Sequence, residues 1–112
     1  MLLVKNDFVY LNFMNLITQN IESIKALCKS HKVKSLYAFG SVLSDKFNDE
    51  SDIDLIVNFS DVQLLDYADN YFDLKFSLED TLKRPIDLLE EKAIKNPYLK
   101  KAIQKNMQLI YG

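Results

Sequence analysis

The sequence predicts a mixed α+β (α/β) fold, in which a short mixed β-sheet of about three strands packs against about four helices. Two observations lead to this fold class. Segments with the apolar spacing of helices take turns along the chain with short, continuous apolar runs that are typical of buried strands. The chain has 112 residues, of which 48% are hydrophobic, and this is enough for one hydrophobic core.

Three segments have the apolar spacing of amphipathic helices. Residues 15–31 are expected to form one helix, because apolar residues recur there every three or four positions. Asp61 is a suitable N-cap for a second helix, whose apolar spacing continues until Pro85 stops it. A last helix is expected to begin near Pro97 and to run toward Met107.

Three short apolar runs, 33–39, 53–59 and 86–89, predict the strands. The first run ends at Gly40, and a short helix is expected between the first two strands. Pro85 stands at the start of the third run, where its missing N–H is tolerated. The strands and helices therefore alternate, which favours one mixed sheet with helices packed on it.

The domain organisation follows from the absence of internal boundaries. No segment repeats, and no linker rich in Gly, Ser or Pro divides the chain, so residues 14–112 are expected to form a single domain. Residues 1–13 are apolar but follow neither a helical nor an alternating pattern. They are left unassigned, as an N-terminal extension.

Charge and composition exclude several classes of function. The 14 Lys and Arg residues against 16 Asp and Glu residues give a net charge of -2, which disfavours binding to duplex nucleic acid. No apolar run approaches the roughly 20 residues of a membrane span. The single cysteine, Cys28, allows no internal disulfide, so a cytoplasmic location is expected.

A glycine followed by a serine, Gly40-Ser41, stands where the first strand is expected to end. A glycine backbone lets a ligand approach closely, and helical N–H groups with a hydroxyl suit a phosphate. A turn glycine followed by a serine N-cap explains the same two residues without a ligand. The dipeptide alone leaves both interpretations open.

Three aspartates interrupt the apolar runs. Asp52 and Asp54 lie two residues apart at the start of the second strand, so both carboxylates fall on one face of it. Asp87 interrupts the third strand, and it joins the other two if the second and third strands pair. Such a cluster is typical of the magnesium sites of phosphoryl transfer, because carboxylates placed together repel unless a cation compensates them. An exposed position on an edge strand explains Asp87 equally well.

The dipeptide and the aspartates together resemble a known motif. Gly40-Ser41, ten further residues and then Asp52-Ile53-Asp54 is similar to the signature of the minimal nucleotidyltransferases of the polymerase-beta-like superfamily. Asp87 falls where that family has its third carboxylate, and the resemblance extends over residues 14–111. It implies the small nucleotidyltransferase fold.

More narrowly, the chain resembles the MNT antitoxins of prokaryotic HEPN/MNT toxin-antitoxin systems. The resemblance implies an enzyme that uses ATP and one or two Mg²⁺ ions to transfer AMP onto a tyrosine of its partner, a HEPN-domain ribonuclease toxin, and so neutralises it. It implies that Asp52 and Asp54 ligate magnesium and that Asp87 activates the attacking hydroxyl or shares the metal. It also implies nucleotide-binding roles for Gly40, Ser41 and Ser51.

The chain departs from many relatives directly after the dipeptide. Val42, Leu43 and Ser44 stand where relatives often carry an arginine, and the only arginine of the chain is Arg84. We therefore expect a lysine such as Lys46 to neutralise the triphosphate.

Two other functions stay open at this point. A non-catalytic antitoxin could block the HEPN toxin by covering its active site, with the carboxylates kept but catalysis unimportant. A nucleotidyltransferase could also act on a small molecule or an RNA end, although a chain of this size leaves little surface for a separate substrate domain.

Four further features are explained by capping, core packing or solvent exposure, without a functional role. His31 is expected to cap the first helix, and Cys28 to lie in the core. The aromatic residues of the second long helix are also assigned to the core, namely Tyr67, Tyr71, Phe72 and Phe76. The lysines near the C-terminus are typical of a solvated helix face, although they could contact a partner: Lys92, Lys95, Lys100, Lys101 and Lys105.

Overall fold

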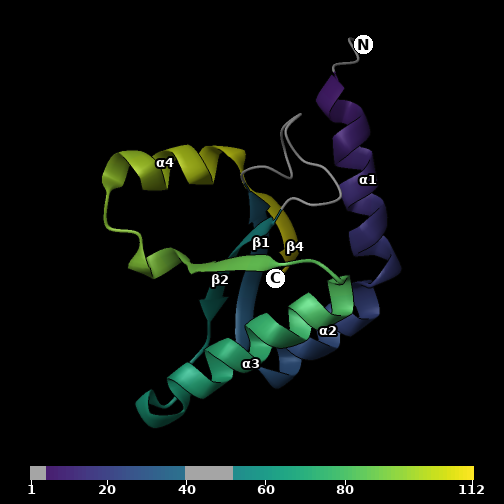
Figure 1. The fold of residues 1–112 in the computed structure, drawn as a ribbon. Helices are drawn as coiled ribbons and strands as arrows, with labels where there is room; N and C mark the ends of the chain where they lie inside the picture. The colour runs from purple at the N-terminus through teal and green to yellow at the C-terminus, as the bar shows by residue number, and fades with distance from the viewer. Residues whose placement is uncertain (1–4, 40–51) are drawn as a thin grey trace.

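The computed structural model describes residues 5–39 and 52–112, with side chains from residue 11 onward. The described elements follow one another as shown in Figure 1. They are α1 (Lys5–Gln19), α2 (Ile21–Ser30), β1 (Val33–Phe39), β2 (Ile53–Phe59), α3 (Leu64–Leu82), β3 (Ile86–Glu90), the 3₁₀ turn η2 (Glu91–Ala93), α4 (Pro97–Asn106) and β4 (Gln108–Tyr111).

The four described strands form one mixed sheet in the order β3-β2-β1-β4. β1 pairs antiparallel with both β2 and β4, whereas β2 and β3 run parallel. Parallel neighbours need a crossover connection, and α3 supplies it between β2 and β3. The predicted α+β class is confirmed, but the expected number of about three strands was too low because β4 was not foreseen.

The main core lies on one face of the sheet, against α2 and α3. It joins apolar side chains from helices and strands that are nearly inaccessible to solvent, among them Phe13, Ile24, Leu55, Leu74 and Leu88. Helix α4 lies on the other side of the sheet from α2 and α3 in Figure 1. On that side Ile56 of β2 and Ile103 of α4 are also buried.

The single helix expected at residues 15–31 is wrong, because the chain changes direction at Asn20 between α1 and α2. The Asn20 side chain donates a hydrogen bond to the Leu16 carbonyl at 2.8 Å, and its own carbonyl accepts from the Ile24 N–H at 2.9 Å. Helix α1 begins at Lys5, inside the segment that the sequence left unassigned, and Phe13 of that segment is buried.

The boundaries of the later helices agree with the sequence except at one N-cap. Helix α3 begins at Leu64 with Gln63 as its N-cap, and not at Asp61. It ends at Leu82, and its C-cap Lys83 takes the left-handed conformation (φ 58°) that commonly closes a helix. Asn96 caps α4 by accepting the N–H groups of residues 98 and 99. The short helix expected between the first two strands lies outside the described residues.

His31 and Cys28 lie as expected, whereas two of the aromatic residues do not. His31 is the C-cap of α2, and Cys28 is fully buried. Phe72 and Phe76, which the sequence assigned to the core, are instead half-exposed on α3. No helix within the described ranges combines the length and the apolar character needed to cross a membrane.

Candidate active site

The strands β2 and β3 bring two carboxylates side by side. Their parallel register pairs the Cα atoms of Asp54 and Asp87. Paired residues of neighbouring strands point to the same face of the sheet, and such strands lie about 4.8 Å apart. Asp54 is half-buried, and Asp87 is exposed on the edge strand β3. The strand pairing that the convergence of the aspartates required is therefore present.

Two further residues mark the surroundings of this pair. Asp52 is exposed and comes two residues before Asp54, just ahead of the first residue of β2. Phe39, the last residue of β1, is the antiparallel partner of Asp54. The C-terminal end of β1 therefore adjoins the N-terminal ends of β2 and β3, where the carboxylates stand.

Hydrogen bonds at the start of β3 fix the position of Asp87. The Ile53 N–H donates to the Pro85 carbonyl at 2.9 Å, which extends the β2–β3 pairing by one step. On the other side, Oε2 of Glu79 accepts the N–H of Ile86 at 3.0 Å. Glu79 also lies 3.4 Å from Nζ of Lys75, one helical turn earlier on α3. Helix α3 thus holds the first residue of β3, directly before Asp87.

Tyr71 of α3 contacts β3 at Leu88, one residue after Asp87. Its hydroxyl donates a hydrogen bond to the backbone carbonyl of Leu88. Burial raises the pKa of the Tyr71 phenol, and the negative charge of Asp87 raises it further. Neither Glu79 nor Tyr71 carries a sequence signal for this role, because each meets β3 only through the packing of α3.

Four of the predicted site residues lie outside the described residues, namely Gly40, Ser41, Lys46 and Ser51. Arg84 is described, and it is half-buried in the connection between α3 and β3. It precedes Asp87 by three residues, at the end of the sheet that carries the carboxylates.

The donor atoms of the pair fit magnesium. Asp54 and Asp87 offer oxygen ligands, and Mg²⁺ commonly takes one or two carboxylates while waters and substrate phosphates complete its coordination. Over residues 5–39 and 52–112, no group of three or more Asp, Glu, His or Cys side chains is arranged to hold an ion. The described residues therefore suit an ion that is shared with a phosphate ligand, and not a closed metal site made by protein alone.

A known domain family matches the part of the chain that contains this carboxylate pair. The family model described as "Polymerase beta, Nucleotidyltransferase" matches residues 22–112. The chain belongs to this nucleotidyltransferase family. The matched region contains the strands β2 and β3, and α1 lies wholly before it.

Known relatives within the nucleotidyltransferase family are similar over most of the chain. A protein of Methanocaldococcus jannaschii named "Putative protein adenylyltransferase MJ0128" is 40% identical over 83 residues, which are 74% of this chain and 82% of the relative.

Solved structures agree with the family fold. A solved structure described as "Structure of putative minimal nucleotidyltransferase" is 26% identical and matches with a TM-score of 0.67, over 81% of this chain and 89% of that one. The structure of a tri-AMPylated Shewanella oneidensis HEPN toxin in complex with MNT antitoxin matches with a TM-score of 0.58 at 21% identity, over 85% of this chain and 71% of that one. At that identity the second likeness shows the fold alone.

Proposed function

We propose that this protein is an antitoxin that transfers AMP from ATP onto a tyrosine hydroxyl of a HEPN-domain toxin and thereby neutralises it. The observation that carries the proposal is the register that pairs Asp54 with Asp87 in a chain of the nucleotidyltransferase family. The name of the methanogen relative and the modified toxin in the Shewanella complex support AMP as the transferred group and a HEPN protein as its acceptor.

The proposed step is an in-line displacement at the α-phosphorus of ATP. The tyrosine oxygen forms a bond to this phosphorus while the bond to the bridging oxygen of the β-phosphate breaks, and pyrophosphate leaves. The tyrosine gives up its proton in the same step. Asp87 is exposed on the edge strand, so its carboxylate is accessible to a hydroxyl brought by a second protein. We assign it either the acceptance of this proton or a share of the metal.

Magnesium would be held by Asp54 and Asp87, with Asp52 beside them, and when bound it would neutralise charge on the transferring phosphoryl group. The carboxylates themselves disfavour ATP, because the nucleotide brings several negative charges to aspartates that already repel one another. We therefore expect ATP to bind weakly in the presence of a chelator.

The remaining roles are proposed from the sequence motif. Gly40, Ser41 and Ser51 would bind the nucleotide, and Lys46 would neutralise part of the triphosphate. A cytoplasmic location is proposed as well, and the free thiol of Cys28 suits a reducing compartment.

The test is intact mass spectrometry of a HEPN-domain partner from the same organism after incubation with this protein, ATP and Mg²⁺. We expect a mass gain of one or more adenylates, located on tyrosine by peptide mapping. Asp54→Asn should abolish the gain. Asp61→Asn is the matched control, since Asp61 is exposed beyond the opposite end of β2, and it should keep the gain.

Other outcomes separate the alternative functions. A partner that stays unmodified but is still bound and inhibited would contradict the transfer and favour steric blocking. Consumption of ATP at the same rate without any partner would instead point to a small molecule or an RNA end as acceptor.

A further inference from the structure

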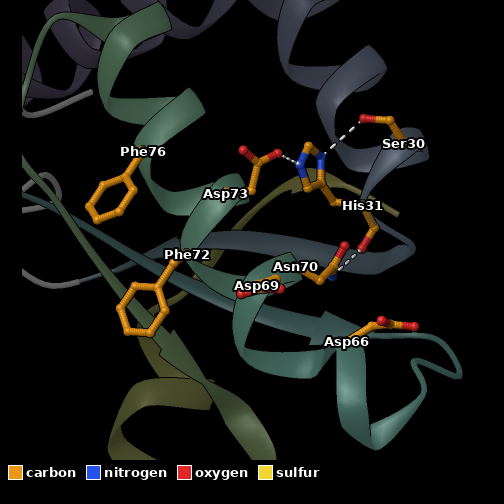
Figure 2. Close-up of a pocket in the computed structure, with 8 residues that line it drawn as sticks. All are labelled: Ser30, His31, Asp66, Asp69, Asn70, Phe72, Asp73 and Phe76. Atoms are coloured by element: carbon orange, nitrogen blue, oxygen red, sulfur yellow. Dashed lines mark hydrogen bonds and ion pairs between the residues drawn. The ribbon is translucent and has the colours of Figure 1, made fainter.

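Helix α3 carries an acidic stripe on its outer face. Asp66, Asp69 and Asp73 are spaced by three and four residues, so they lie on one side of the helix, and all three are exposed. Together with the end of α2 they line a hollow of about 600 Å³, shown in Figure 2. In this hollow Oδ2 of Asp73 lies 2.6 Å from Nε2 of His31.

Two aromatic rings border the acidic stripe. The side chains of Phe72 and Phe76 also line the hollow and are 50% and 57% exposed. Their rings are stacked with centroids 6.0 Å apart, and both extend from α3 on the side away from His31 in Figure 2. Exposed apolar surface that gathers beside charged residues is typical of an interface between proteins.

Helix α4 presents a stripe of opposite charge. Tyr98, Lys101 and Lys105 repeat the spacing of three and four residues and are exposed, with Tyr98 83% accessible. We call these three residues the basic stripe. Leu99, which is half-exposed, follows Tyr98 and widens the apolar end of the stripe.

The two stripes match in length and in the order of their side chains. In each stripe the first and last residues are seven positions apart, or about 10.5 Å at 1.5 Å per residue. When the helices are set antiparallel, Lys105 and Lys101 fall opposite the aspartates, and Tyr98 falls beside Phe72 and Phe76. Within one chain the two helices lie on opposite sides of the sheet in Figure 1, so the stripes are apart from each other.

We propose that two copies of this chain associate through the acidic stripe of one copy and the basic stripe of the other. The occupant is a second copy because this chain itself carries the surface with complementary charge, spacing and aromatic end. Because the two stripes lie on opposite sides of the sheet, one partner cannot cover both, so the copies associate head to tail and can add further copies. The association goes beyond the proposed function and involves none of the active-site residues.

The test is sedimentation velocity of the full chain at low salt, at concentrations up to roughly 1 mM, the range of weak interfaces. We expect a reversible, concentration-dependent dimer or higher species that dissociates as salt is added. The double variant Asp66→Lys, Asp69→Lys should weaken the association roughly tenfold or more, because it places like charges together. Asp73 is left intact since it holds His31.

A mixing experiment gives the decisive readout. The double variant Lys101→Glu, Lys105→Glu should also fail to self-associate, because both of its stripes are acidic. The two double variants should pair with each other, since each stripe of one then meets the opposite charge on the other. Circular dichroism checks that both variants are folded.

Two results would overturn the proposal. One is a wild-type protein that stays monomeric at every concentration tested. This result would overturn the proposal even if a different protein bound the acidic stripe. The other is an association that the charge reversals leave unchanged. Asp52→Asn with Asp54→Asn should self-associate like the wild type, so a failed transfer activity does not bear on this result.

Discussion

Oε2 of Glu79 accepts the backbone N–H of Ile86 at 3.0 Å, seven residues further along the chain. This bond joins the last turns of α3 to the first residue of the edge strand β3, directly before Asp87. The acidic side chain of Glu79 therefore serves the position of the strand, whereas Asp54 and Asp87 are the carboxylates to which we assign the chemistry.

Glu79→Ala should destabilise the protein by about 1–2 kcal/mol, because it leaves the Ile86 N–H without this acceptor. It should also lower AMP transfer, since Asp87 follows Ile86. Glu79→Gln keeps an acceptor oxygen and is expected to lose less than half as much. Urea denaturation of both variants measures the difference, and equal losses in the two would contradict a role for the hydrogen bond.

Asp87→Asn should lower AMP transfer at least about 100-fold, as expected for the loss of a proton acceptor or metal ligand. The same change should raise the free energy of unfolding in the absence of metal by roughly 0.2–1 kcal/mol, because like charges on paired residues of neighbouring strands repel. Activity and stability thus change in opposite directions. Thermal unfolding in a chelator checks the stability.

Binding of Mg²⁺ and nucleotide gives a second measurement for Asp87→Asn, with Asp61→Asn as its control. Addition of Mg²⁺ with a non-hydrolysable ATP analogue should raise the melting temperature of the wild type, because a ligand that binds only the folded state stabilises it. It should raise that of Asp61→Asn equally and that of Asp87→Asn much less. An equal rise in all three proteins would contradict a share of the metal for Asp87 and leave it the role of proton acceptor.

Burial raises the pKa of the Cys28 thiol from 9.0 to about 12. The unfolded chain therefore loses this proton above pH 9 while the folded protein keeps it, so the stability from Cys28 is complete below pH 9 and declines as the pH rises toward 12. Cys28→Ala removes this dependence. The wild type should have a higher free energy of unfolding than Cys28→Ala at pH 8, and this difference should be smaller by about 1 kcal/mol at pH 10.

Urea denaturation at the two pH values measures this difference. Taking wild type minus variant cancels the titration of the tyrosines and lysines that both proteins share. If the difference in free energy of unfolding between the wild type and Cys28→Ala is the same at pH 8 and pH 10, the thiol is accessible to solvent in the folded state.

The sequence predicted β1, β2, α3, β3 and α4 closely, because each has a clear apolar period or a defined stop such as Pro85. It missed the break at Asn20, since the apolar spacing continues across it and the turn depends on how α1 packs. It missed β4 because a four-residue edge strand has no room for an alternating pattern.

At the site, alternation along β2 and β3 was enough to select Asp54 and Asp87 as polar positions in apolar strands. Their pairing was not readable from the sequence, because the register of a parallel pair is set by the crossover helix and its packing. The exposure of Phe72 and Phe76 was also missed, since helical spacing alone does not tell buried aromatic residues from exposed ones.

The most direct test of the account is to locate the bound ion. Mn²⁺ in place of Mg²⁺, added with a non-hydrolysable ATP analogue, broadens the NMR signals of nearby backbone amides. We predict that the signals of Asp54 and Asp87 broaden first, while those of Asp66 and Asp69 in the acidic stripe stay sharp. Broadening at Asp66 and Asp69 with Asp54 and Asp87 unaffected would contradict the assignment of the active site.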